Sequence, residues 1–158
     1  MMRVLSVDPG TYETAWLLFD PSTREVHGFG KVKNEDFLVA CKDRAFSPTV
    51  PYLTVMEGME SFGRPVGKEV LDTVFWSGRF AEHCAPWTII YRSEIKLHLC
   101  NSRRAKDPEI RQALLDRFGG RESVRKGGKL SGVKGDVWSA LAIAVTFCET
   151  KSSALLHC

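Results

Sequence analysis

The chain has 158 residues, of which 44% are hydrophobic and 26% are charged, a composition that is ordinary for a soluble globular protein and excludes intrinsic disorder. This length suits one core, so we expect residues 1–158 to form a single domain. No stretch approaches about 18 consecutive apolar residues, and the N-terminus lacks the basic-then-apolar layout of a secretory signal. We therefore expect a cytoplasmic protein with no membrane partner.

The net charge of +3 conceals an uneven distribution along the chain. Residues 92–134 hold 12 Lys and Arg against 5 Asp and Glu, a balance of +7 that leaves −4 for the rest of the chain. A basic segment of this kind commonly meets phosphate backbones, and a solvated surface is an equally good interpretation of it.

The cysteines are odd in number and widely scattered, with no C-x-x-C pair among them. This pattern argues against a zinc site and against a disulfide framework. We interpret all five as reduced thiols: Cys41, Cys84, Cys100, Cys148 and Cys158.

Three short strands are predicted in the first part of the chain. Residues 2–8, 13–19 and 25–32 are apolar or alternating, and the turn-forming segments DPGTY and DPSTR separate them. We expect three antiparallel strands joined by tight turns. Residues 34–47 give a weak signal that is either helical or irregular.

The remainder of the chain mixes strands and helices. Its predicted elements are strands at 52–58 and 87–91, helices at 68–84, at 92–118 with a break near 101–106, and at 136–149, and a mobile loop rich in Gly, Lys and Ser at 121–135. This order predicts an α/β fold with a mixed five-stranded sheet, three antiparallel strands being followed by two parallel ones, and with helices on both faces.

Three acidic residues each stand at the edge of an apolar element. Asp8 ends the first strand, Glu57 ends the fourth, and Asp136 begins the last helix. If the first and fourth strands are parallel neighbours, their C-terminal ends bring Asp8 and Glu57 together. Crowded carboxylates repel one another unless a cation lies among them, and oxygen ligands favour Mg²⁺ or Mn²⁺. Two such ions can activate a water and stabilise the leaving oxygen in phosphodiester cleavage.

Each of these carboxylates also has a purely structural interpretation. Asp8 precedes Pro-Gly and could be a turn residue, and Glu57 could be a strand-end charge that faces solvent. Asp136 could cap the helix by accepting backbone N–H bonds. Their joint occurrence at the ends of predicted elements favours a metal site over these alternatives.

Four segments resemble the motifs of RuvC-type Holliday junction resolvases, which belong to the RNase H-like superfamily. The segments are V-D-P-G at 7–10 followed by Thr11, V-M-E at 55–57, I-K-L-H-L-C-N-S-R-R-A-K at 95–106 and D-V-W-S-A-L-A-I-A-V-T at 136–146. They occur in the family's order over most of the chain, and residues 62–80 look closer to the compact RuvC-like nucleases of bacteriophages. The resemblance implies an RNase H-like fold, a crossover junction endonuclease activity and, for a phage-borne member, a place in the cytoplasm of a bacterial host.

The resemblance also implies roles for individual residues. Asp8, Glu57 and Asp136 would be ligands of two Mg²⁺ or Mn²⁺ ions, with Asp8 bridging both, and Lys96 would face the DNA near the cut site. We expect a further group of basic residues to grip the DNA backbone, which makes binding sensitive to salt: Arg103, Arg104, Lys106, Arg125, Lys126 and Lys129.

Three positions depart from the family's pattern. The family has a second acid three residues into the last helix, where this chain has Ser139, which would still face the site because residues three apart share a helix face. Ser139 could hold a metal-bound water, or the protein could be catalytically weak or inactive. Glu60 stands where the bacterial enzyme has a base-contacting phenylalanine; Phe62 could replace that ring or pack on the core. Lys106 falls one place short of a family lysine.

The helix at 68–84 carries more large apolar side chains than one sheet face readily covers. They are Val70, Val74, Phe75, Trp76 and Phe80. The surplus indicates an isologous dimer contact, as the resemblance also implies, and burial in the core is an equally good interpretation.

Our leading hypothesis is a homodimeric, Mg²⁺- or Mn²⁺-dependent endonuclease that recognises branched DNA such as four-way junctions, forks or flaps. The first alternative, motivated by Ser139, is a branched-DNA-binding module without catalysis. The second is an actin-like phosphotransferase, because an Asp-x-Gly-Thr turn also cradles ATP phosphates in that fold. Such kinases need a second nucleotide-binding domain, for which 158 residues leave too little room.

Overall fold

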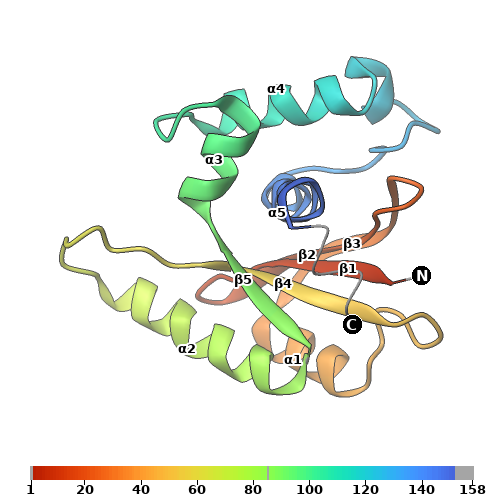
Figure 1. The fold of residues 1–158 in the computed structure, drawn as a ribbon. Coiled ribbons are helices and arrows are strands. Elements are labelled where there is room, and N and C mark those ends of the chain that lie inside the picture. Colours follow the sequence, from red (N-terminus) through yellow and green to blue (C-terminus); the bar gives the residue numbers. More distant parts are fainter. Residues whose placement is uncertain (1, 85, 152–158) are drawn as a thin grey trace.

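The structure is a computed structural model that describes residues 2–84 and 86–151, and a five-stranded sheet forms its centre (Figure 1). The strands are β1 (Arg3–Asp8), β2 (Glu13–Asp20), β3 (Glu25–Lys33), β4 (Tyr52–Gly58) and β5 (Trp87–Tyr91). Their order across the sheet is β3-β2-β1-β4-β5; β2 pairs antiparallel with β1 and β3, and β4 pairs parallel with β1 and β5. The predicted strands and the predicted mixed sheet are confirmed.

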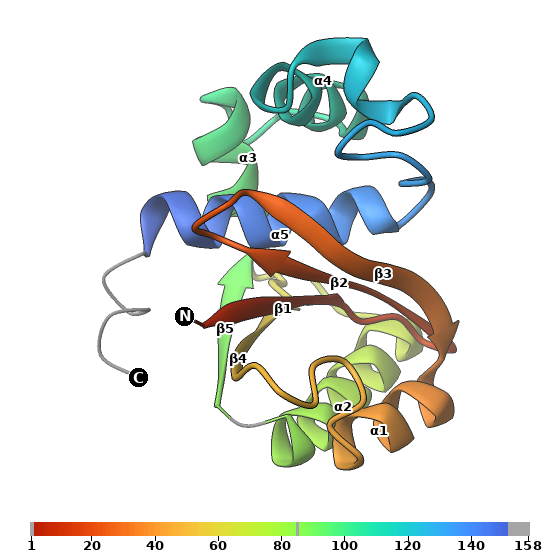
Figure 2. The same ribbon diagram turned by 90° about the vertical axis from the view of Figure 1, so that its right-hand side faces the viewer.

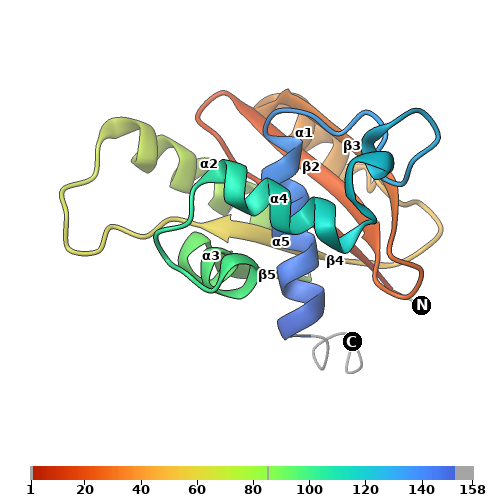
Figure 3. The same ribbon diagram turned by 90° about the horizontal axis from the view of Figure 1, so that it is seen from above.

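Helices cover both faces of the sheet. They are α1 (Asn34–Lys42), α2 (Lys68–His83), α3 (Arg92–Cys100), α4 (Asp107–Arg117) and α5 (Val137–Thr150), with a short 3₁₀ helix, η1 (Gly120–Val124), after α4. In Figure 1, α1 and α2 lie below the sheet and α5 lies above it, and Figure 2 shows α3 and α4 as an outer layer over α5. Seen from above in Figure 3, α4 crosses over α5. Of the residues 34–47, whose signal is weak, Asn34–Lys42 form helix α1, and the rest form a turn and irregular structure.

Alternating strand side chains build two cores, one on each face of the sheet. Val4 of β1 and Val55 of β4 belong to the core under α5, whereas Leu5 and Met56, their neighbours in sequence, belong to the core over α1 and α2. Helix α5 is apolar almost all round because the sheet lies on one side of it and α3 and α4 on the other. Within the described ranges, no helix is both long and apolar enough to span a membrane.

The segment 121–135, predicted to be a mobile loop, is instead packed against the molecule. The N–H of Leu130 donates a hydrogen bond to the carbonyl of Ser123, and Leu130 and Val133 are buried in the core on the α5 face. Single apolar residues between glycines and lysines produce no periodic pattern, so the sequence did not predict that these two residues are buried. The basic side chains of the segment stay exposed: Arg125, Lys126 and Lys129.

Cys41 and Cys84 form a disulfide, so the interpretation of these two residues as reduced thiols is wrong. Cys41 lies near the end of α1 and Cys84 directly follows α2, and both are buried in the core of that face. Their separation of 43 residues gives no hint of the pair, because only the packing of α1 beside α2 brings them together. Cys100 and Cys148 are free thiols. Cys158 and the rest of the C-terminal LLHC segment lie outside the described residues.

Candidate active site

The parallel pairing of β1 with β4 places Asp8 beside Glu57. Val7 lies opposite Met56 in the register, so the next residue of each strand falls level with its neighbour at the C-terminal edge. Both side chains point to the α5 face, because each lies an even number of residues after a strand residue of that core. The expectation that two strand ends bring these carboxylates together is confirmed.

Burial and mutual repulsion oppose ionisation of this pair. Glu57 is only 9% exposed, so the alternative of a solvent-facing strand end is wrong. Burial, reinforced by the charges of Glu57 and Asp136, raises the pKa of Asp8 to about 7. Burial also raises the pKa of Glu57, while the charge of Arg92 and a hydrogen bond with Asp8 act in the opposite direction. Two neighbouring acids that are largely shielded from water repel one another when both are charged, and a divalent cation with a preference for carboxylate oxygens would relieve this repulsion.

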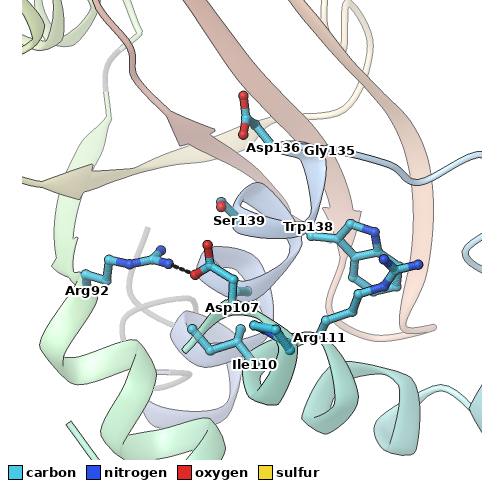
Figure 4. Close-up of a pocket in the computed structure, with 10 residues that line it drawn as sticks. Arg92, Asp107, Ile110, Arg111, Gly135, Asp136, Trp138 and Ser139 are labelled. Atoms are coloured by element: carbon cyan, nitrogen blue, oxygen red, sulfur yellow. Dashed lines mark hydrogen bonds and ion pairs between the residues drawn. The ribbon is translucent and has the colours of Figure 1, made fainter. Parts of the chain in front are cut away.

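Asp136 lies immediately before α5, and its carboxylate pairs with a lysine as well as acting on Asp8. Its charge reaches Asp8, but its Oδ2 lies 2.6 Å from the Nζ of Lys31 on β3. Lys31 also pairs with Glu13, at 3.4 Å. Asp136 makes no side-chain capping bond to α5, so the interpretation of this residue as a helix cap is wrong. In Figure 4 its carboxylate points away from Ser139.

The predicted trio is therefore assembled in part. Asp8 and Glu57 fit a divalent cation as they stand, whereas Asp136 would have to turn away from Lys31 to join them. Across the part of the chain that the structure describes, no three His, Cys, Asp or Glu side chains are gathered as a group that could hold an ion in this arrangement.

Two charged residues beside the pair were missed by sequence reasoning. Arg92 begins α3 directly after β5, and its Nη1 lies 3.7 Å from Oε1 of Glu57. The Nη2 of the same guanidinium binds the carboxylate of Asp107, the first residue of α4. Arg92 could have been found, since β5 ends at the same edge of the sheet as β1 and β4. The position of Asp107 carried no such signal, because it depends on how α4 folds back over the site.

Ser139 lines a cavity of about 320 Å³ together with Asp136, Arg92 and Asp107. Figure 4 shows this arrangement, with Asp136 just before α5, Ser139 on the first turn of α5 and Asp107 on the facing α4. Ser139 thus lies beside Asp136 in the same cavity, as helix spacing predicts. Arg111 also lines the cavity, and its guanidinium lies over the ring of Trp138, 4.7 Å from the centroid.

A second cavity, of about 450 Å³, adjoins Glu57 on the side of the projecting segment between β4 and α2 (Figure 1). Three predicted DNA-binding residues line it: Phe62, Lys96 and Arg103. Lys96 lies near enough for its charge to lower the pKa of Glu57. Phe62 is 73% exposed and has a left-handed backbone, with φ of 51°, so the alternative that packs it on the core is wrong.

The remaining predicted DNA-binding residues are exposed but line neither of these two cavities. Arg104 and Lys106 lie on the turn between α3 and α4, and Arg125, Lys126 and Lys129 lie on the packed segment after η1. Arg125 pairs with Glu122 at 2.6 Å. Their role in DNA binding stays a prediction.

We predict that Asp8→Asn stabilises the cation-free protein, and does so more at pH 8 than at pH 5. The pKa of Asp8 in the folded state, about 7, exceeds its ordinary value of 3.8, so the wild type loses stability as the pH rises between these two values. At 1.36 kcal/mol per pKa unit, the full loss is about 4 kcal/mol above pH 7. Asparagine cannot ionise and escapes this loss. Thermal unfolding in EDTA at several pH values measures the difference.

Asp116→Asn is the matched control, because Asp116 is an exposed acid on α4 whose carboxylate accepts a bond from Gln112. Its unfolding temperature should follow the wild-type pH profile. If the unfolding temperatures of the wild type and of Asp8→Asn change with pH in parallel, Asp8 is not an acid whose ionisation the fold opposes.

Comparison with known proteins finds likeness in structure alone. No family model and no curated protein matches the chain. Thermus thermophilus RuvC superposes with a TM-score of 0.70 at 14% identity, covering 97% of both chains. T. thermophilus RuvC in complex with Holliday junction substrate gives 0.66 at 16% identity, covering 92% of both chains. The fowlpox virus resolvase in complex with Holliday junction DNA gives 0.55 at 14% identity, covering 93% of this chain and 99% of that one.

At these identities the likeness establishes the fold. The strand order, the helices on both faces and the coverage of nearly the whole chain all agree with it. The chain has the RuvC-like form of the RNase H-like fold.

Proposed function

We propose that this protein is a divalent-cation-dependent nuclease that cleaves branched DNA. The observation that carries the proposal is the contact between the half-buried carboxylate of Asp8 and the buried carboxylate of Glu57, at the ends of neighbouring parallel strands. Two acids buried together are costly to ionise without a cation, and the packing of the sheet does not need them. Two proteins with a similar fold have structures in complex with Holliday junction DNA, and this analogy supports a branched substrate.

Asp8, Glu57 and Asp136 would hold the cations, Mg²⁺ or Mn²⁺. Such ions, when bound, supply a water of lowered pKa and stabilise negative charge on a phosphate. The protein supplies part of this positive charge itself, since Arg92 pairs with Glu57 and Lys31 with Asp136.

The cavity beside Glu57 supports a role in phosphate binding. Lys96, Arg103 and Arg92 line it and present positive charge next to the carboxylates, where a phosphate to be cut would lie. Phe62 projects from the same wall, exposed, and suits stacking on a base that is unpaired at a branch. The remaining exposed basic residues would extend the contact along the DNA backbone: Arg104, Lys106, Arg125, Lys126 and Lys129.

The alternative is a branched-DNA-binding module of the same fold that is catalytically weak or inactive. Two observations favour it. Ser139 presents a hydroxyl where a carboxylate would strengthen cation binding, and Asp136 is held by Lys31 at 2.6 Å. A binding module would retain its affinity for a labelled junction and leave the DNA uncut in both Mg²⁺ and Mn²⁺.

We predict that Asp8→Asn lowers the rate of junction cleavage by about 10²–10⁴-fold, because Lewis-acid stabilisation is worth several kcal/mol. Junction binding should remain, since Asp8 carries no positive charge toward phosphate. The assay is a panel of four-way junction, Y-fork, flap and linear duplex, each with Mg²⁺ and with Mn²⁺. Gel shifts on the same DNA measure the affinity.

The reciprocal double variant, Lys96→Ala with Arg103→Ala, should lose affinity for the junction. The logarithm of its binding constant should also fall less steeply with the logarithm of the salt concentration, by about 2 in the slope. Lys42→Ala, an exposed change on α1 across the sheet, is its control. Full cleavage by Asp8→Asn would remove the assignment of Asp8 to the cation site, and an uncut panel with the wild type would favour the binding module.

The exposed face of α2 supports a homodimer. Phe80 is fully buried in the core and Trp76 packs partly against it, so these two of the predicted residues serve the fold. Leu71, Val74 and Phe75 remain 58%, 49% and 69% exposed, respectively. An apolar group of this size on one helix suits an isologous contact with a second copy of the chain.

We predict that Phe75→Asp weakens this dimer by at least about 30-fold, the equivalent of 2 kcal/mol for a residue at the centre of a contact. Sedimentation equilibrium over a range of concentrations measures the change. Val39→Asp is the control, because Val39 is 55% exposed on α1. A wild type that is monomeric at every concentration, or equal weakening by both variants, would contradict a dimer through α2.

A further inference from the structure

The turn that follows Asp8 is held from the α1 side by one buried residue, Asn34. Asn34 is the first residue of α1, and 0% of its surface is exposed. Its Nδ2 donates a hydrogen bond to the carbonyl of Gly10, at 2.9 Å, and its backbone N–H donates another to the carbonyl of Tyr12, also at 2.9 Å. Two carbonyls of the turn between β1 and β2 are therefore bound to the same residue.

The side-chain amide of Asn34 is itself held in place by Thr14 of β2. The hydroxyl of Thr14 donates a hydrogen bond to Oδ1 of Asn34, at 2.7 Å, and Thr14 is also fully buried. The carbonyl of Gly10 can only accept a hydrogen bond, so Nδ2 of the amide has to face it. The carbonyl thus sets which end of the amide faces the turn, and the hydroxyl holds the other end.

These side-chain bonds do not serve the helix on which Asn34 lies. Lys33 is the N-cap of α1, and no side chain among the described residues caps this helix. Asparagine forms helices less readily than alanine does, and a buried amide costs free energy unless it is hydrogen-bonded. The presence of an asparagine here is accounted for by the turn and not by α1.

The position of Gly10 is passed on to Asp8 with little freedom. Pro9 lies between them, and its ring fixes its own φ and restricts the preceding residue to extended conformations. A side chain at Gly10 would collide with the carbonyl of Glu13, so the turn is closely folded. A shift of Gly10 therefore moves the end of β1, where Asp8 lies beside Glu57.

The α2 side of the turn is held less firmly. The hydroxyl of Thr11 lies 3.4 Å from the carbonyl of Glu69 and 3.4 Å from the hydroxyl of Thr73, both on α2. These distances exceed the usual range for a bond between two oxygens, about 2.5–3.0 Å. The shorter, buried bonds of Asn34 are accordingly the main constraint on the turn.

We propose that Asn34 is a positioning residue of the candidate active site, which holds Asp8 beside Glu57 through the carbonyl of Gly10. The inference rests on the proposed function, since it concerns the geometry of the same carboxylates. Asn34 touches neither DNA nor a cation, because α1 lies on the face of the sheet opposite to α5 (Figure 1). Its loss therefore changes the rate of cutting and leaves the affinity for DNA as it is.

The test compares Asn34→Ala with Ser47→Ala. Ser47 is the matched control, because it is 4% exposed and donates a side-chain hydrogen bond to the carbonyl of Val50, at 2.7 Å. Val50 precedes β4, at the edge of the sheet opposite to the carboxylates. Both variants lose a buried hydrogen bond and should unfold at a lower temperature. Asn34→Ala alone should slow single-turnover cleavage of a bound four-way junction, by about 10–100-fold, with its junction affinity unchanged in gel shifts.

Thr14 supplies a second pair of variants, which decides the matter if Asn34→Ala does not fold. Thr14→Val keeps the shape of the side chain without the hydroxyl, and Thr14→Ser keeps the hydroxyl without the methyl group. Thr14→Val should slow cleavage by about fivefold, the equivalent of about 1 kcal/mol for one hydrogen bond. Thr14→Ser should cleave as the wild type does. A cleavage rate that follows the unfolding temperature of the variants, and not the presence of the hydroxyl, would overturn the positioning role.

Amide hydrogen exchange of the protein without DNA or cation tests the same contact without cleavage. Exchange at residues 10–15 should be about tenfold faster in Asn34→Ala than in Ser47→Ala. Equal exchange in the two variants, or faster exchange with an unchanged cleavage rate, overturns the inference and leaves the proposed function standing. A wild type that cuts no junction overturns the proposed function, and faster exchange in Asn34→Ala would still support the contact between Asn34 and the turn.

Discussion

The parallel contact between β1 and β4 is the constraint on which the rest of the site depends. It sets Asp8 level with Glu57, and strand alternation turns both carboxylates under α5, away from most of the solvent. Burial and repulsion then oppose the charge of each acid. The folded protein would be more stable with neutral residues at these two positions. Destabilising acids of this kind are typical of functional sites. Arg92 pairs with Glu57 and Lys31 pairs with Asp136, so these two side chains bring positive charge to the site.

Much of the fold could be predicted because its signals are local. Short alternating or apolar runs bounded by turn residues marked the five strands, helical spacing marked α2, and a long apolar run marked α5. The meeting of Asp8 with Glu57 needed one further rule, that parallel neighbours end at the same edge of a sheet. The motif at 136–146 placed Asp136 near them, although it could not show that Lys31 draws this carboxylate aside.

Other features of the structure depend on tertiary packing, which no local sequence pattern predicts. Asp107 meets Arg92 only because α4 folds over α3, and Cys41 meets Cys84 only because α1 lies beside α2. Leu130 anchors a segment that its composition marks as a loop. The contact of the outer basic residues with DNA and the likeness of residues 62–80 to phage nucleases stay predictions, since neither follows from the fold.

Calorimetric titration of the wild-type protein with Mn²⁺, in pairs of buffers that differ in ionisation enthalpy, tests the central claim most directly. Because the pKa of Asp8 lies near 7, cation binding should displace more protons at pH 6 than at pH 8. That pH dependence would show that the ion takes the place of a proton on a buried acid. Saturable binding without proton release at pH 6, or no saturable binding at either pH, would contradict the account.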